Sequence, residues 1–358
     1  MTMNRWMTAA CAAAVACAGC TESKLDAAAD ITLTGKLLKA DKQPVAGALL
    51  KIDRSSNSSC VFDIFGANWK SVKSNADGTF SLQLLGADTQ NGSLARCFSL
   101  RSPSGEKGRT VSVEFIVQAE NLQLPTLQEW SGAPTAAAGG DGVSVGFQDL
   151  SATHEGATGA SHTVSVRKKS SGTVWSFTKA NSPVQVSDYH LEDAAELEAS
   201  LYAVRTVKTD GTDYTVRYYG DAVDLPQRGR VPVSRGANCT YPGAPTTACP
   251  LTDGNLSSVV SFQQNTRDVV IQLAQPKVLR KALLRNFGTF FSASELTLEG
   301  STDGTTWIPL ANLTSRQDDS FIEVDLNNPT ALSQVRLHAV SSDQSFNISE
   351  LSELSLFE

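Results

Sequence analysis

Three short motifs could carry hydrolytic chemistry, and none has the surroundings that this chemistry needs. The segment GVSVG at 142–146 has the spacing of a serine hydrolase nucleophile, which must lie on a tight strand-to-helix turn. Here alternating valines continue as a strand, and no helical pattern follows. Ser-x-x-Lys occurs at 104–107 and 165–168, but the penicillin-binding mechanism needs both residues on one helical turn, and neither segment has a helical pattern.

Histidines and paired carboxylates give no stronger candidate for catalysis. The sequence has four histidines, none of them at the HxH or HExxH spacing of a metal site. Asp318 and Asp319 are adjacent in a polar stretch, where a solvated loop is expected. A glycosidase needs two carboxyl groups on opposite sides of a pocket, one of them with a raised pKa. The sequence therefore favours a protein that is not an enzyme.

Composition predicts a folded protein that is rich in β-strands. At ~150 residues per domain, 358 residues predict two to three domains. A hydrophobic content of 41% is enough for packed cores, and the net charge of −7 argues against a nucleic-acid binder, which needs a basic face. Short runs of Val, Ile, Leu, Thr and Phe alternate with Gly, Asn, Asp and Ser, which predicts an all-β fold.

The N-terminus has the pattern of an export signal. A positive Arg5 precedes a short apolar stretch that cannot span a bilayer, and the stretch ends in Ala-Gly-Cys20. This sequence resembles a bacterial lipobox, which implies a signal peptide at 1–19, lipidation of Cys20 and a tether at 20–29. A plain secretory signal is the alternative, and Cys17 is a second acceptor. Thr21 after Cys20 favours anchoring to the outer membrane.

Four cysteines remain in the exported part: Cys60, Cys97, Cys239 and Cys249. An even number in an oxidising compartment predicts two disulfides. Four cysteines allow three pairings, of which the local ones, 60–97 and 239–249, fit the domain boundaries below. A zinc site is disfavoured, because the sequence has no CxxC motif and no nearby pair of histidines.

Two units precede the most informative part of the chain. In residues 30–121, the run LTGKLLKADKQPVAGALLKI and the later NADGTFSLQL resemble a carboxypeptidase-regulatory-like domain, a transthyretin-like β-sandwich. In residues 122–235, Trp130, Trp175 and the run LEASLYAVRTVKTDGTDYTVRYYG resemble a fibronectin type III domain, with Tyr202 at its tyrosine corner. We expect both to be sandwiches arranged head to tail, acting as a stalk.

Residues 236–358 resemble the discoidin, or coagulation factor type C, domain, a galactose-binding-like jelly roll. The match rests on Asp253-Gly254, Leu273 with Pro276, the SxDGxxW segment from Ser301 to Trp307, Arg336, and Ser352-Glu353-Leu354. The tryptophan that usually follows the early Asp-Gly is absent. The fold class predicted for the whole chain is thus all-β, with three tandem β-sandwich domains.

The discoidin resemblance implies a structural calcium ion and a ligand rim. Asp253 and Glu353 would hold the calcium with backbone carbonyls, and Ser258 is a further candidate; caps without metal are the alternative. Sugar sites combine an aromatic platform with polar groups for the hydroxyls. The candidates in the rim loops are Arg285, Asn286, Phe290, Phe291, Phe346 and Asn347. The alternative is that these phenylalanines close the end of the core.

These features predict a lipid-anchored envelope protein that binds rather than catalyses. The expected ligand of the C-terminal unit is carbohydrate, and the expected partners are carbohydrate or an envelope protein, with the membrane reached through the lipid and no nucleic acid. Two alternatives are a structural or assembly subunit of an envelope complex, and an enzyme with a site outside known motifs.

Overall fold

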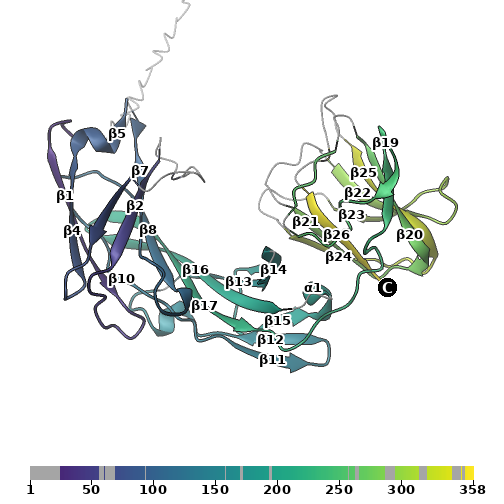
Figure 1. The fold of residues 1–358 in the computed structure, drawn as a ribbon, viewed down its shortest axis with the longest axis horizontal. Helices are drawn as coiled ribbons and strands as arrows, with labels where there is room; N and C mark the ends of the chain where they lie inside the picture. Colours follow the sequence, from purple (N-terminus) through teal and green to yellow (C-terminus); the bar gives the residue numbers. More distant parts are fainter. Residues whose placement is uncertain are drawn as a thin grey trace, which may run out of the picture.

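The chain is built almost entirely from β-strands, which confirms the predicted all-β class (Figure 1). The computed structural model describes residues 25–55, 60, 69–92, 94–157, 159–169, 172–192, 196–256, 258–262, 266–286, 295–313, 321–340, 348 and 351–358. The expected signal peptide and Cys20 lie outside these residues. Within them, the only α-helix is α1 (Asp188–Leu191).

The N-terminal sandwich packs two sheets around a core that includes Ile31, Leu33 and Phe98. One sheet has the order β10-β1-β4 with β9 also on β1, and the other contains β3-β2-β7-β8. The strands are β1 (Asp30–Leu38), β2 (Leu49–Arg54), β3 (Lys70–Lys73), β4 (Thr79–Leu85), β5 (Gln90–Asn91), β6 (Leu94–Ala95), β7 (Cys97–Arg101), β8 (Thr110–Ile116), β9 (Asn121–Gln123) and β10 (Leu127–Gln128), with short 3₁₀ turns at Gly86–Thr89 and Glu106–Gly108.

The predicted turn before β4 depends on a glycine. Gly78 has φ +81°, and a Cβ atom there would lie 2.4 Å from the carbonyl oxygen of Leu37. Asp77 supports the same turn, because its carboxylate accepts hydrogen bonds from the backbone and hydroxyl of Thr79. The turn therefore requires glycine both for its backbone conformation and for the close approach of β1.

The middle sandwich packs the sheet β11-β12-β15 against β14-β13-β16-β17. Its elements are β11 (Thr135–Gly139), β12 (Gly142–Gly146), a 3₁₀ turn (Leu150–Ala152), β13 (Ser161–Lys168), β14 (Gly172–Thr178), β15 (Val184–Ser187), β16 (Leu197–Thr209) and β17 (Thr212–Asp224). Asp210 and Gly211, both with positive φ, form the two-residue hairpin turn between β16 and β17 that the sequence predicts. The hydroxyl of Tyr202, the expected tyrosine corner, accepts a hydrogen bond from the Arg217 side chain.

The first two sandwiches share one sheet, which differs from the expected head-to-tail arrangement. Eight strands run in the order β14-β13-β16-β17-β8-β7-β2-β3, and β17 of the middle sandwich pairs antiparallel with β8 of the N-terminal one. Val216 lies opposite Val113 at this junction, and both are buried in a single core that extends through both sandwiches. The expected boundary at 121/122 therefore separates segments that fold around a common core.

The C-terminal sandwich has antiparallel sheets of six and three strands around its own core. The sheets have the orders β19-β18-β20-β25-β22-β23 and β24-β21-β26. The strands are β18 (Asn238–Tyr241), β19 (Ala244–Ala248), β20 (Asp268–Val278), β21 (Lys281–Asn286), β22 (Glu295–Ser301), β23 (Ile308–Asn312), β24 (Phe321–Asp325), β25 (Ala331–Val340) and β26 (Leu351–Phe357). Two facing antiparallel sheets are the architecture of a jelly roll.

The C-terminal sandwich docks on the middle one through its three-stranded sheet. Every residue of β26 is buried, because one face covers the C-terminal core and the other lies against α1 and Glu192, the residue after it. Leu283 and Phe357 belong to the core of the first two sandwiches, and the Phe357 ring lies 5.1 Å from that of Tyr189 in α1. Strands β21 and β26 of the three-stranded sheet are therefore covered on both sides, whereas the edge strand β24 is partly exposed.

Both disulfides of the local pairing are present. Cys60 is bonded to Cys97 in the N-terminal sandwich, and Cys239 is bonded to Cys249 in the C-terminal one. This confirms the predicted disulfides and selects one of the three pairings. Each bond lies within one sandwich, so neither holds two sandwiches together.

Candidate functional site

Strand ends at one end of the C-terminal sandwich flank the predicted ligand residues. The register pairs Asn286 with Leu351 in the small sheet and Glu295 with Val340 in the large one. The connections 287–294 and 341–350 therefore both join the two sheets at this end. Phe290, Phe291, Phe346 and Asn347 belong to these connections and lie outside the described residues. Asn286 is placed as the last residue of β21.

Arg285 lies in the contact between sandwiches, although the sequence analysis expected it on an exposed rim. Its side chain is 2% exposed and forms an ion pair with Glu192, which follows α1. Its Nε donates to the carbonyl oxygen of Val174 at 2.6 Å, and its Nη1 donates to Ser355 Oγ at 3.0 Å. All three guanidinium nitrogens are engaged inside the protein, so this arginine stabilises docking rather than offering a free surface.

Glu192 is the centre of this buried polar cluster. Its side chain is 2% exposed, and besides Arg285 it accepts hydrogen bonds from Arg235 Nη2 and Ser355 Oγ, each at 2.6 Å. A buried charge is tolerated when it is paired and fully hydrogen-bonded. Two arginines and a hydroxyl supply this compensation, and all three come from the segment 235–355 that follows the middle sandwich.

The residues expected to hold calcium meet around Gly254. The carboxylate oxygens of Glu353 accept a hydrogen bond from the Gly254 N–H at 3.2 and 3.3 Å, while Asp253 Oδ1 accepts from the Asn255 N–H. Ser258 Oγ donates to the Asn255 carbonyl oxygen. Burial, followed by the nearby Glu192 carboxylate, raises the pKa of Glu353 to about 8, although Arg285 and Arg235 act in the opposite direction.

The residues around Gly254 carry oxygen ligands of the kind that a cation needs, but only two of them are carboxylates. Glu353 is 1% exposed, and the nearby Asp253 carboxylate is one of the groups that raise its pKa, an effect that a bound cation would oppose. Oxygen atoms of carboxylates, hydroxyls and backbone carbonyls are the donors that calcium prefers. Among the described residues, however, no three His, Cys, Asp or Glu side chains gather as a metal site. Calcium binding stays a prediction, with Asp253 and Glu353 as the residues that would hold it.

The SxDGxxW segment forms the turn between β22 and β23. The Asp303 carboxylate accepts backbone hydrogen bonds from Thr305 and Thr306, and these bonds hold its pKa well below the usual range. The Arg336 guanidinium lies 4.5 Å from the ring centre of Trp307 and pairs with Glu299. This motif therefore builds a turn at the end of the sandwich opposite to the paired strand ends Asn286–Leu351 and Glu295–Val340.

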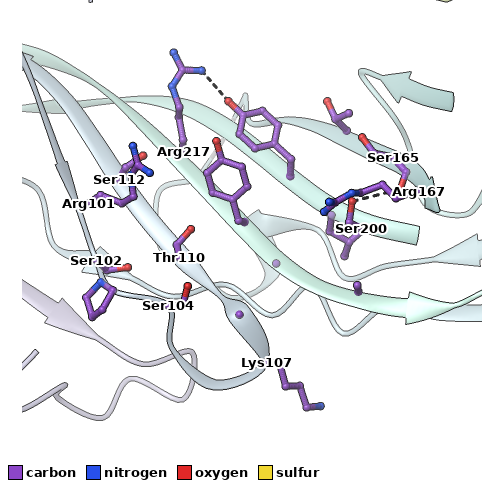
Figure 2. A pocket seen from close by; sticks show the side chains of 18 of the residues that line it. Arg101, Ser102, Ser104, Lys107, Thr110, Ser112, Ser165, Arg167, Ser200 and Arg217 are labelled. Atoms are coloured by element: carbon purple, nitrogen blue, oxygen red, sulfur yellow. Dashed lines mark hydrogen bonds between the residues drawn. The ribbon is translucent and has the colours of Figure 1, made fainter. Parts of the chain in front are cut away.

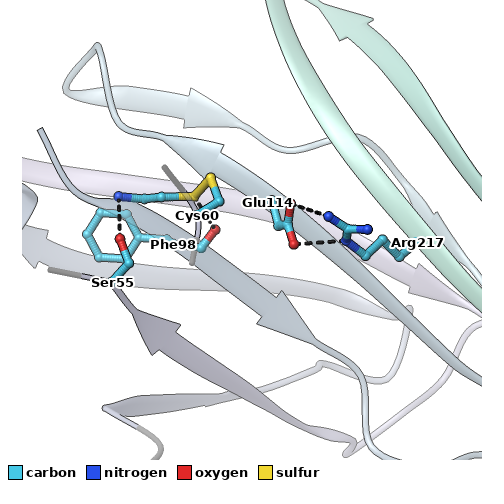
Figure 3. Close-up of a disulfide and its surroundings, with 6 residues drawn as sticks. Ser55, Cys60, Phe98, Glu114 and Arg217 are labelled. Carbon is cyan, nitrogen blue, oxygen red and sulfur yellow. Dashed lines mark hydrogen bonds and ion pairs between the residues drawn. A yellow bond between two sulfur atoms is a disulfide. The ribbon is translucent and has the colours of Figure 1, made fainter. Parts of the chain in front are cut away.

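A groove that the sequence analysis did not identify crosses the shared eight-stranded sheet. It has a volume of about 1150 Å³ and is lined by side chains from both of the first two sandwiches (Figure 2). Arg217 of β17 lies in it, paired with Glu114 of β8 through two hydrogen bonds of 2.8 and 3.0 Å (Figure 3). Alternating polar residues in the strands were its only sequence signal, because the pairing of β8 with β17 is not visible in the sequence.

The motifs considered for catalysis have structural roles in the described part of the chain. Residues 142–146 form strand β12, as expected, and Ser144 Oγ accepts a hydrogen bond from Gln185. His162 Nε2 accepts from the Leu150 N–H, and His190 Nε2 bonds Glu323 at 2.8 Å. No helix among the described residues has the length and apolar character needed to cross a membrane.

Among known proteins, only solved structures are similar to part of this chain in the comparisons made. No family model matches the sequence, and no curated protein matches it. Part of the chain is similar to chitosan-binding module 1 of a chitosanase/glucanase from Paenibacillus sp. IK-5, with 19% identity, a TM-score of 0.30, and coverage of 36% of this chain and 98% of that one.

Two further similar structures come from Clostridium perfringens. CBM32-1 from a family 31 glycoside hydrolase shares 17% identity with a TM-score of 0.27, covering 30% of this chain and 82% of that one. The protein named CpGH89CBM32-6 shares 17% identity with a TM-score of 0.29, covering 36% and 98%. Because these TM-scores lie below 0.5, functional conclusions for this chain depend on its own residues.

Proposed function

We propose that this chain is a non-catalytic carbohydrate-binding protein of the bacterial envelope, in which the C-terminal sandwich recognises the sugar. The observation that supports this most directly is the strand register, which places at one end of that sandwich the strand ends that flank the two aromatic connections. One connection carries Phe290 and Phe291, and the other carries Phe346 and Asn347. A chitosan-binding module is among the structures similar to part of this chain; a carbohydrate ligand for the chain itself is our proposal.

The residue types at this end suit a sugar. An aromatic ring covers the C–H face of a pyranose, and an amide donates to and accepts from its hydroxyls. The discoidin-like order of motifs in residues 236–358 agrees with the observed pair of antiparallel sheets. Arg285 has no part in this binding, because its guanidinium is engaged by Glu192, Val174 and Ser355.

The rest of the chain serves as an arm in this proposal. The first two sandwiches share a sheet and a core, and the third docks on the second through a buried ion pair. Such contacts favour a stiff arm over a flexible string of domains. We further propose that Cys20 carries the lipid and anchors the arm to the outer membrane, as the lipobox resemblance implies.

A glycan array probed with the whole exported chain tests this function. The C-terminal sandwich should not be excised, because its Leu283 and Phe357 pack in the neighbouring core. We expect binding to a defined sugar that Phe290→Ala and Phe346→Ala abolish. Trp307→Ala is the matched control, since Trp307 follows the β22–β23 turn at the opposite end.

Two results would overturn the proposal. A silent array over folded protein would favour the alternative role of an assembly subunit in an envelope complex. If both phenylalanine variants still bind the sugar, the carbohydrate site does not lie at this end of the sandwich.

A further inference from the structure

The groove on the shared sheet is long and polar, and it belongs to neither of the first two sandwiches alone. It extends from Lys51 on β2 to Thr173 on β14. These strands are separated by six strand-to-strand steps, which at ~4.8 Å per step corresponds to about 29 Å. Successive side chains of a strand point to opposite faces, so every second residue of these strands faces the groove. The shape suits an extended chain rather than a compact ligand.

The groove carries an excess of positive charge on a protein whose net charge is −7. Among the described residues, Lys51 and Arg167 line it and form no ion pair. Arg101 and Lys107 have only long contacts, 3.6 Å to Asp53 and 3.9 Å to Asp221, and their side chains are 56% and 64% exposed. Lys51 and Arg167 are therefore open to a ligand, and Arg101 and Lys107 can exchange these long, exposed ion pairs for contacts with one.

The acidic groups of the groove leave this excess largely intact. Glu114 is neutralised by the two-point hydrogen bond with Arg217, so neither side chain contributes net charge. Asp221, next to the groove, is held by Arg109 through hydrogen bonds of 2.5 and 2.8 Å. Glu198 is the remaining acid in the lining. Two unpaired cations and two loosely paired ones therefore face one uncompensated carboxylate in the lining.

A tyrosine pair and small hydroxyl side chains supply the remaining surface. The rings of Tyr202 and Tyr219 are 5.1 Å apart, and Tyr219 is 45% exposed. Arg217 donates to the Tyr202 hydroxyl at 2.8 Å and fixes this ring in place. Around the pair, hydroxyls such as those of Thr110 and Ser200 offer both a donor and an acceptor (Figure 2).

We propose that this groove binds an acidic polysaccharide, that is, a glycan chain bearing carboxylate or sulfate groups. The cations would pair with the acidic groups, Tyr219 would contact the C–H face of a sugar ring, and the hydroxyls would bond those of the sugar. Apart from the two tyrosines, only Pro103, Leu201 and Ala222 in the lining carry apolar side chains, which are few contacts for the side chains of a peptide. An acidic protein with two unpaired and two loosely paired cations in the groove is a poor match for nucleic acid, whose binding needs a strongly basic face. This site is separate from the one proposed for the C-terminal sandwich.

Matched polymers test the charge and the sugar backbone separately. Binding of the whole exported chain is measured to dextran sulfate, to uncharged dextran, and to polygalacturonate as the carboxylate source. We expect the two acidic polymers to bind, dextran to bind weakly or not at all, and the affinity to fall as salt rises. Tighter binding of dextran sulfate would identify sulfate as the recognised group, and tighter binding of polygalacturonate would identify carboxylate.

Variants locate the binding in the groove. Arg101→Ser with Arg167→Ser is expected to raise Kd about ten-fold, which corresponds to two exposed charge contacts of about 0.7 kcal/mol each. Tyr219→Ala is expected to raise it several-fold without changing the salt dependence. The control, Lys36→Ser with Lys39→Ser, removes the same charge from β1 and the turn after it, in the facing sheet, and should leave Kd unchanged.

Three outcomes overturn the assignment. Equal affinity of the groove and control variants would show that the charge of the groove does not matter. Equal binding of dextran and dextran sulfate would exclude recognition of acidic groups. Equal binding of poly-aspartate or single-stranded DNA at matched charge would show that the groove does not select a glycan. The glycan-array result for Phe290→Ala concerns only the C-terminal sandwich. The proposal for the groove and the proposed function can therefore be refuted separately.

Discussion

Arg285 of the C-terminal sandwich and Glu192 of the middle one form an ion pair in which each side chain is only 2% exposed. The two residues are 93 positions apart in the chain. Ser355 bonds both of them, and Arg235 bonds Glu192 from the segment before β18. A buried ion pair at a domain contact fixes the relative position of the two sandwiches, because moving them apart would leave each charge without its partner. This contact is the structural basis of the stiff arm proposed above.

Replacing one partner of this pair should destabilise the protein. Arg285→Met leaves Glu192 buried with one arginine fewer, and the loss of a buried partner typically costs about 3–5 kcal/mol. We expect a value near 3 kcal/mol, since Arg235 still binds Glu192. Chemical denaturation measures this loss. Lys277→Met is the control, because the pair of Lys277 with Glu358 is exposed and should contribute about 1 kcal/mol or less.

A double-mutant cycle separates the pair from simple packing. Combining Arg285→Met with Glu192→Gln should cost less than the sum of the two single changes, with a coupling of about 1–3 kcal/mol. Additive losses would show that the two side chains act independently and would contradict the role given to the pair. Small-angle scattering of Arg285→Met should report whether the C-terminal sandwich separates from the arm.

The same contact should weaken in acid through Glu323. Hydrogen bonds from His190, and then from Lys281, lower the pKa of Glu323 to about 2 despite partial burial. A carboxylate whose folded pKa lies below its unfolded value of 4.5 contributes stability that is complete above pH 5 and is lost as pH falls towards 2. Because the side chain is 31% exposed, screening limits this to about 1–2 kcal/mol.

Unfolding curves between pH 2 and 7 check this expectation. Glu323→Gln should be less stable than the unmodified chain at pH 7, and its stability should fall less steeply between pH 5 and pH 2. Asp325→Asn serves as the comparison, because Asp325 also pairs with Lys281 but is 74% exposed. Parallel pH profiles for the Glu323 variant and the unmodified chain would rule out this linkage.

Alternation of apolar and polar residues predicted most of the buried strands. Every second residue is buried throughout β1 and as far as Val166 in β13, which is the pattern that the sequence displays. The alanine-rich β11, mostly exposed at a sheet edge, lacks this alternation and was not predicted. The Asp210-Gly211 hairpin was predicted, because only residues tolerant of positive φ suit such a turn.

Long-range pairing could not be predicted from local patterns. Nothing in β8 or β17 alone indicates that they pair, so the shared sheet and its groove were missed. Arg285 was assigned to a ligand rim because it precedes an aromatic segment. The register instead places it with Leu283 on the outer face of β21, and its acidic partner comes from the preceding sandwich. Identifying Glu192 as that partner requires knowledge of how the sandwiches dock.

Calcium, if bound as the discoidin resemblance implies, should stabilise the C-terminal sandwich. Asp253 and Glu353 flank Gly254 and would connect the early loop to β26. A ligand that binds only the folded state stabilises it by about 2.7 kcal/mol at 100 times its Kd. We therefore expect a higher Tm with calcium than with chelator, and no difference in Glu353→Gln. An unchanged Tm in the unmodified chain would favour capping without metal, and magnesium is the control for ion size.

The Val113–Val216 pair predicts that the first two sandwiches unfold together. These valines lie opposite each other where β8 meets β17, and both are at most 1% exposed. Val216→Ala removes buried methyl groups at the junction and should cost about 1–3 kcal/mol. Because the core is continuous, hydrogen exchange should accelerate in β1 and β12 alike, although they belong to different sandwiches. Val145→Ala, in β12 and away from the junction, should likewise accelerate exchange in both strands, because it weakens the same continuous core. Faster exchange confined to the middle sandwich in Val216→Ala would show that the two sandwiches unfold independently despite their shared sheet.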